Sequence, residues 1–218
     1  MNGELDSWIA RQSAVAAEQL LAAVSATELV KERPGFGQTI RPAPGSILAS
    51  PVPAAYDPDP DYFFHWLRDG AVVVDALNLL ESQGRAEAAV KYEEYLRFSL
   101  ALCDLDGRDL LADGAPIDRA GEEWKQYVRP AEELARIAGD AALAEPRFNP
   151  DGTLDILKWS RPQHDGPAMR ALSNLRWRAA LPADAMKIRD DLIRRDLDFT
   201  ERRWSMPSVD IWEEESGF

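Results

Sequence analysis

Long connections rich in proline and glycine separate the helix-forming segments of this chain, and they constrain its fold more than any other feature. Residues 31–63, "KERPGFGQTIRPAPGSILASPVPAAYDPDPDYF", cannot form a regular helix, because proline lacks an amide proton and clashes with the preceding turn. We expect an irregular segment there, with one short strand at residues 46–50. Residues 104–124 and 144–164 are irregular in the same way. Long ordered connections of this kind often build a binding site.

Helix-forming residues dominate the segments between these connections. We predict helices over residues 4–25, 68–82, 86–102 and 184–203, a shorter helix that begins at Pro130, and a further helix in "DGPAMRALSNLRWRAAL" capped by Asp165. Gly84 is expected to end the second of these helices, so that the second and third form an αα-hairpin. About six helices with no strong strand pattern indicate an all-α fold.

Charge and composition exclude several classes of function. The net charge of −13 argues against nucleic acid or an anionic membrane as a partner, because neutralising phosphates requires clustered lysine and arginine. The single cysteine, Cys103, permits no intramolecular disulfide, and two histidines are too few and too scattered for structural zinc. The start, "MNGELDSWIARQSAVAAEQLLAAV", lacks a basic region, and no apolar run approaches the roughly 20 residues of a membrane span. We therefore expect a cytoplasmic protein.

The first stretch whose residues could bind a ligand or take part in a reaction is "PDYFFHWLRDGAVV", residues 60–73. Aromatic faces stack on sugar rings, and an Arg68–Asp69 pair could hold hydroxyl groups through charge-assisted hydrogen bonds. The competing interpretation is structural: the aromatics form core, Asp69 caps a helix and Arg68 pairs with another residue. His65, beside Trp66, is expected to be a spectator, although it could touch a sugar hydroxyl.

The second stretch is "EPRFNPDGTLDILKWSRPQHDGPAMRA", residues 145–171. Within it, Trp159, Arg161, Gln163 and Asp165 fall close together in a loop that ends in a helix. An indole with several hydrogen-bonding groups suits a polyhydroxylated ligand. A packed tryptophan before a capped helix would give the same pattern, so this stretch alone leaves both interpretations open.

The third stretch is "VDIWEEESGF", near residue 218. Hydrolysis of a glycosidic bond needs a carboxylic acid that is protonated near neutral pH and a carboxylate on the other side of the sugar. Neighbouring carboxylates and an apolar wall favour the protonated form. Trp212, Glu214 and Asp210 could provide that setting for Glu213. A solvated acidic tail is the competing interpretation.

Together, the three stretches resemble the glucoamylase family, glycoside hydrolase family fifteen, and "GSILASPV" ahead of the first stretch fits the same resemblance. The resemblance implies an (α/α)6 toroid of six inner and six outer helices, with the site at one end of the inner ring. It implies hydrolysis of α-glucans or α-gluco-oligosaccharides with inversion, releasing β-glucose. It also implies that Glu213 is the general acid, and that substrate is bound or the acid supported by Arg68, Asp69, Trp159, Glu214, Asp210 and Arg161.

The chain departs from the family pattern after the acid. Inversion needs a second carboxylate roughly 6.5–9.5 Å from the acid, and in the family this base lies far downstream. Residues 1–218 contain no match to it. We therefore expect the first half of a partial toroid, truncated after the general-acid motif, with apolar helix faces exposed. Such a chain would be inactive alone, would self-associate, or would need a complementing C-terminal half.

Two other functions stay open. A non-catalytic glucan-binding or regulatory relative would keep the sugar-binding residues without the base. The cluster "DDLIRRDLD" suits a helical prenyl-chain cyclase, but such acids usually form solvated pairs with arginine along a helix. Within the hydrolase interpretation, α-1,4 glucans, isomaltose-type linkages and trehalose are all open as substrates. Acid–base hydrolysis requires no metal or cofactor, so none is expected.

Overall fold

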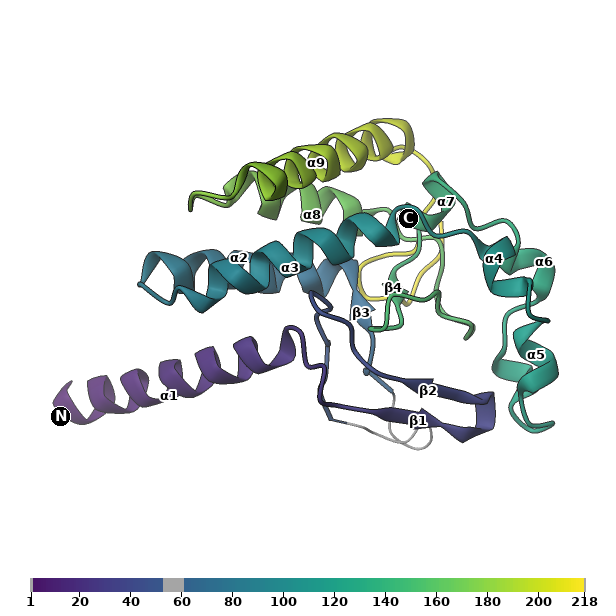
Figure 1. The fold of residues 1–218 in the computed structure, drawn as a ribbon, viewed down its shortest axis with the longest axis horizontal. Coiled ribbons are helices and arrows are strands. Elements are labelled where there is room, and N and C mark those ends of the chain that lie inside the picture. Colours follow the sequence, from purple (N-terminus) through teal and green to yellow (C-terminus); the bar gives the residue numbers. More distant parts are fainter. Residues whose placement is uncertain (1, 53–60, 218) are drawn as a thin grey trace.

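The computed structural model describes residues 2–52 and 61–217. The longer helices are α1 (Asn2–Ala23), α2 (Leu67–Ser82), α3 (Glu87–Leu102), α8 (Asp165–Arg176) and α9 (Ala183–Arg203) (Figure 1). The shorter helices are α4 (Gly107–Leu111), α5 (Pro116–Arg119), α6 (Ala131–Leu134) and α7 (Asp140–Leu143), with 3-10 turns η1 (Pro34–Phe36) and η2 (Lys125–Tyr127). The strands are β1 (Lys31–Arg33), β2 (Gln38–Ile40), β3 (His65–Trp66) and β4 (Arg147–Phe148).

The predicted helices are confirmed within one to three residues at most of their ends. Gly84 follows α2 with φ +90°, and its amide donates to the carbonyl of Glu81, so the αα-hairpin of α2 and α3 closes as expected. The helix expected to begin at Pro130 is the short α6, for which Pro130 is the N-cap. Asp165 is the first residue of α8 rather than its cap, which is His164.

The strand predicted at residues 46–50 is wrong. Ile47 and Leu48 are buried, but Ile47 packs into the helical core, and its only strand-like pairing is an isolated bridge to Val24. The apolar run therefore reflects burial rather than a sheet. The hairpin of the irregular segment is instead β1–β2, which turns through η1 and Gly37 at φ +63°. Residues 53–60 of that segment lie outside the described residues.

Four helices surround the main core. α2 packs against α3 and α8, and α9 packs against α3 and α8, so each has two neighbours in this set. Inside, the Arg170 guanidinium of α8 forms a fully buried ion pair with Asp196 of α9. On the outer side of α9, Asp191 pairs with Arg194 and Arg195, as the helical spacing predicts. The acidic residues of "DDLIRRDLD" thus form ion pairs along α9 and one buried ion pair in the core.

Apolar side chains are exposed on several helices, as expected for a partial toroid. Only the C-terminal end of α1 joins the core, through Leu21, while Trp8 near its start is 53% exposed. Figure 1 shows α1 reaching away from the other helices. The other exposed apolar residues of these helices include Leu5, Ile9, Val15, Val72, Leu79, Leu172 and Leu175. None of the helices built from the described residues is long and apolar enough to cross a membrane.

Buried His65 predicts a pH dependence of stability. Burial, helped by the charge of Arg170, lowers the pKa of His65 to about 3. Unfolded His65 binds a proton near pH 6.5, so the free energy of unfolding is expected to fall as the pH drops from 6.5 to about 3. This group contributes at most about 1.4 kcal/mol per pH unit.

The variant His65→Gln keeps an oxygen that can accept the hydrogen bond that His65 Nδ1 now takes from the amide of Ile47. Urea denaturation of both proteins between pH 3 and 6.5 measures the effect. A flatter profile in the variant is the expected result. Identical slopes would contradict the assignment of this pH dependence to His65.

Candidate active site

The carboxylate of Glu213 lies at the centre of a cluster of nitrogen donors. Its side chain is 16% exposed. Oε2 accepts a hydrogen bond of 2.7 Å from the indole of Trp159. Oε1 accepts bonds from three donors: Trp66 Nε1 at 3.2 Å, Arg68 Nη2 at 3.3 Å and Gln163 Nε2 at 3.0 Å. Glu213 is therefore held inside the protein rather than in a solvated tail, as the functional interpretation requires.

The loop that carries Glu213 bends sharply at this residue. Glu213 has φ +64°, a left-handed conformation that is uncommon for a residue with a side chain. Ser160 Oγ donates to the Glu213 carbonyl at 3.0 Å, and Val209 and Ser216 form an antiparallel bridge across the base of the loop. Asp210 Oδ1 accepts from the amides of Glu214 at 2.9 Å and Glu215 at 3.2 Å. These contacts hold the strained bend.

Replacing Asp210 by alanine is expected to loosen this loop while leaving the helices intact. The amides of Glu214 and Glu215 lose their acceptor, so their hydrogen exchange should become faster by roughly tenfold, the equivalent of one hydrogen bond of about 1.4 kcal/mol. Exchange followed by NMR measures this, with amides of α3 as the internal control. Unchanged protection at Glu214 and Glu215 would show that Asp210 does not brace the loop.

Pairing of two short strands brings the donors together from distant parts of the chain. β3 pairs with β4, so that Trp66 lies opposite Arg147, and the amide of Leu67 donates to the carbonyl of Pro146. β3 leads directly into α2, which presents Arg68, and the loop between β4 and α8 presents Trp159 and Gln163. The first and second stretches of the sequence thus form one side of the site, and the third closes it.

Arg68 connects the three stretches. One of its nitrogens donates to Gln163 at 3.0 Å and to Asp165 at 2.9 Å, and the other reaches Glu213. Asp69 lies beside it, and burial raises the pKa of the Asp69 carboxyl, against the opposing charge of Arg68. Arg68 and Asp69 are therefore partly buried polar groups next to the Glu213 carboxylate, which fits the role in sugar binding implied by the resemblance.

Arg161 does not fit its predicted role in substrate binding. Its guanidinium donates to Glu145 at 2.6 Å, Asp155 at 2.8 Å and the carbonyl of Leu157, and the side chain is 10% exposed. Reaching a ligand would break two buried ion pairs. It belongs instead to a buried network beneath Trp159, whose members are Arg129, Glu145, Arg147, Asp155 and Arg161.

The aromatic setting of Glu213 also differs from the expectation. Trp212 is 76% exposed, and Glu214 is exposed, with its amide bound to Asp210. The indoles that enclose the acid belong to Trp66 and Trp159, whose rings meet edge to face at 6.0 Å. His65 is fully buried, which agrees with the expected spectator and not with the alternative that it touches a sugar hydroxyl. Sequence reasoning placed Trp66 in an aromatic cluster but missed its contact with Glu213, because neighbours in sequence were taken as neighbours in space.

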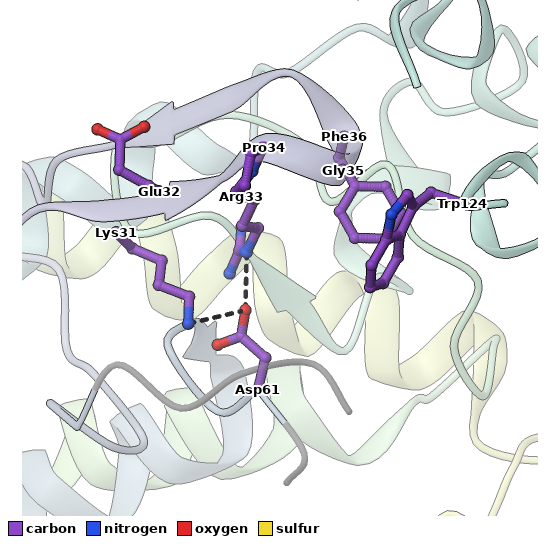
Figure 2. Close-up of a pocket in the computed structure, with 8 residues that line it drawn as sticks. All are labelled: Lys31, Glu32, Arg33, Pro34, Gly35, Phe36, Asp61 and Trp124. Atoms are coloured by element: carbon purple, nitrogen blue, oxygen red, sulfur yellow. Dashed lines mark hydrogen bonds and ion pairs between the residues drawn. The ribbon is translucent and has the colours of Figure 1, made fainter. Parts of the chain in front are cut away.

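A separate cavity of about 250 Å³ lies beside β1 and η1 (Figure 2). At its floor Arg33 donates to Asp61 at 2.8 Å, and Asp61 Oδ1 accepts from the amide of Phe63. At its edge the indole of Trp124 packs so closely on Gly35 that a Cβ there would lie 2.6 Å away. Arg33 and Asp61 are buried and bonded to each other, which leaves them poorly placed to contact a ligand. Glu213 and its donors, which are only partly buried, are therefore the stronger candidate for the active site.

Comparison with known proteins shows the family of the chain. Residues 36–218 match the family model of Glycosyl hydrolases family 15, which covers most of the chain. The chain belongs to glycosyl hydrolases family 15. The resemblance carried by the three stretches is thereby confirmed. All three stretches and the four donors to Glu213 lie within the residues that match family 15.

Similar curated proteins are glucoamylases of yeasts. The glucoamylase of Blastobotrys adeninivorans is 29% identical over 187 residues, which cover 79% of this chain and 25% of that protein. Glucoamylase S1 of Saccharomyces cerevisiae is 28% identical over 225 residues, which cover 98% of this chain and 24% of that protein. The chain thus spans about a quarter of the length of these family 15 relatives.

Solved structures show the same fold. The glucoamylase of Hormoconis resinae superimposes with a TM-score of 0.67 at 24% identity, over 97% of this chain and 31% of that one. The glucoamylase of Saccharomycopsis fibuligera gives a TM-score of 0.65 at 24% identity, over 98% of this chain and 40% of that one. The predicted all-α class is confirmed, and the helices are consistent with part of an (α/α)6 toroid.

Proposed function

We propose that the chain serves hydrolysis of α-glucosidic bonds at the non-reducing ends of α-glucans or oligosaccharides, with Glu213 as the general acid. The observation that supports this most is the carboxylate of Glu213, held by two indole N–H groups, Arg68 and Gln163 in a family 15 chain. A carboxyl group placed among apolar rings and oriented by several donors has the fixed geometry that proton delivery to a glycosidic oxygen requires.

The contacts of Arg68 suggest how substrate prepares the acid. Hydrogen bonds donated to a carboxylate favour its ionised form, whereas a general acid must be protonated. Arg68 now donates to Glu213, and its side chain is 21% exposed. A terminal glucose whose hydroxyls draw Arg68 away would remove one donor and one positive charge from Glu213. Arg68 would then hold the sugar, while Trp66, Trp159 and Gln163 continue to hold Glu213.

The second carboxylate needed for inversion is not assigned among residues 1–218. Of the described acids near Glu213, Asp165 is bonded to Arg68, and Asp69 adjoins the same guanidinium. We propose that these two hold the arginine and the sugar, and that the base is supplied from outside residues 1–218. With a base so placed that a water molecule fits between it and the sugar, the reaction would invert and release β-glucose, as the resemblance implies.

We further propose that residues 1–218 act as the N-terminal half of a glucoamylase-like catalytic domain. The exposed apolar residues of α2 and α8, among them Leu79 and Leu175, support a surface covered by further helices. These helices would come from a longer chain, a complementing second chain or a second copy. The cytoplasmic location expected from the sequence stays a prediction.

The second candidate is a non-catalytic glucan-binding or regulatory protein. It is favoured by one observation: Arg68 and Asp69 are in place beside Glu213, while the acids Asp165 and Asp69 are both associated with Arg68. The two candidates share the sugar site and differ only in turnover.

Calorimetric titration with maltotriose tests the shared site. The 218-residue chain is expected to bind maltotriose, and Arg68→Met is expected to weaken binding at least tenfold, because a charged hydrogen bond contributes about 1.5–3 kcal/mol. Arg176→Met, at an exposed ion pair with Asp75 on the far end of α8, is the matched control and should bind like the wild type. Equal affinities in all three proteins would remove Arg68 from the site. Parallel titrations with isomaltotriose and trehalose report the preferred linkage.

A further inference from the structure

Two arginines and two aromatic rings form a stacked column that ends at the acid. The guanidinium carbon of Arg33, at the floor of the cavity in Figure 2, lies 4.0 Å from the centre of the Phe64 ring. The guanidinium carbon of Arg147 lies 4.1 Å from the same ring. Both guanidinium groups thus pack against the Phe64 ring. Arg147 then stacks on Trp159 at 3.8 Å, and Trp159 donates to Glu213.

Arg147 also touches the second indole of the site. Its guanidinium carbon lies 5.1 Å from the Trp66 ring, and Trp66 donates to the other carboxylate oxygen of Glu213. The residue is 1% exposed and cannot contact a substrate. Nε donates to Asp155 at 2.8 Å, while Nη1 and Nη2 have no hydrogen-bond partner among residues 2–52 and 61–217. The outer part of the guanidinium is therefore held by aromatic faces rather than by acceptors.

We propose that Arg147 is a positioning residue for Glu213, acting through Trp66 and Trp159. The proposal rests on the proposed function only for the role of Glu213 as general acid. The positioning of the indoles by Arg147 is inferred from geometry alone. A planar cation packed between Phe64 and Trp159 fixes the tilt of the indole and so the direction of its N–H group. A cation on the ring face also draws electron density from the indole, which strengthens its N–H as a donor.

The indole N–H signals of the tryptophans provide the test. A ¹⁵N-edited NMR spectrum of the 218-residue chain contains one such signal for each of its 7 tryptophans. Trp66→Phe and Trp159→Phe assign the two signals of interest. Arg147→Lys keeps the charge and can keep the ion pair with Asp155 but loses the planar stack, and Arg147→Met loses both. Arg129→Lys is the matched control, since Arg129 is equally buried in the same network and pairs with Glu145.

In Arg147→Lys, the signals of Trp66 and Trp159 are expected to move upfield as their bonds to Glu213 weaken, while those of Trp8, Trp177, Trp204 and Trp212 stay in place. Arg129→Lys should leave both indole signals near their wild-type positions. In a Glu213→Ala background, Arg147→Lys should shift both signals much less, because the acceptor is gone.

The proposal is overturned if Arg147→Lys folds and leaves both signals unmoved, or if Arg129→Lys moves them as much. It is also overturned if the shift persists at full size without Glu213. If Arg147→Met fails to fold, Arg147→Lys alone decides. None of these readouts depends on turnover, so a failure of the proposed hydrolysis leaves the positioning result intact, and the reverse holds as well.

Discussion

Replacing Asp155 by alanine is expected to lower the free energy of unfolding by about 3–5 kcal/mol, because removing one partner of a buried ion pair leaves its charge uncompensated. The Asp155 side chain is 1% exposed and accepts from Arg147 Nε and Arg161 Nη2, both at 2.8 Å, and from the amide of Leu157. The alanine variant would leave two buried guanidinium groups short of an acceptor. Domains are typically stable by only 5–15 kcal/mol, so this single change removes a large share.

Urea denaturation of wild type and variant measures the effect, and Glu133→Ala is the control. Glu133 accepts from Arg129 at the edge of the same network, but its side chain is 45% exposed. Its loss should cost about 0–1 kcal/mol, as for other surface pairs. If Asp155→Ala unfolded within about 1 kcal/mol of the wild type, the network beneath Trp159 would not stabilise the fold as its burial indicates.

The variant Glu213→Gln is expected to abolish turnover in a complete catalytic domain while sugar binding persists. Loss of a general acid typically costs 10²–10⁴-fold in rate. The substitution has a structural effect as well, because an NH₂ group replaces one carboxylate oxygen and must face either Trp159 or the three donors to the other oxygen. If the NH₂ group faces Trp159, the bond of 2.7 Å from the indole is lost. Binding is therefore expected to weaken by only a few fold.

Glu215→Gln is the control for this experiment. It makes the same chemical change two residues away at an exposed side chain, and only the backbone of Glu215 contacts Asp210. Rates of glucose release from maltotriose compare the proteins. Full turnover by Glu213→Gln would remove Glu213 as the acid, and an equal loss in Glu215→Gln would show that charge on the loop, rather than proton donation, matters.

Local features of the sequence were sufficient for the longer helices, whereas the short helices α4, α5 and α7 were not predicted. Pro130, Asp165 and Gly84 lie at or next to helix ends, because prolines, acidic residues and glycines act on the backbone within one turn. The hairpin of β1 and β2 was not predicted, because its strands carry charged and polar residues and lack the alternation of apolar and polar residues that is typical of a strand. The run at Ile47 was taken for a strand because burial by helices and burial by a sheet leave the same apolar signature.

The residues of the candidate site come together through pairing between distant segments, which the spacing of residues along the sequence cannot show. Arg68 and Arg161 have similar contexts in the sequence, beside aromatics and acids. The pairing of β3 with β4 turns Arg68 toward Glu213 and leaves Arg161 beneath Trp159. Likewise Trp212 adjoins Glu213 in the chain but is 76% exposed, whereas Trp66, far away in sequence, donates to Glu213.

Together these contacts describe a layered site. A buried ion network supports Arg147 and the loop before α8, and Arg147 stacks against the indoles. The indoles, with Arg68 and Gln163, hold the carboxylate of Glu213. The central claim is that this carboxylate serves an inverting α-glucoside hydrolysis whose base lies outside residues 1–218.

Proton NMR of maltotriose, following the anomeric signals of released glucose, tests that claim most directly. The account predicts that the 218-residue chain alone releases no glucose, and that the chain joined to the downstream part of a family 15 catalytic domain releases β-glucose first. Release of β-glucose by the chain alone would contradict the external base. Release of α-glucose first by the joined protein would contradict inversion.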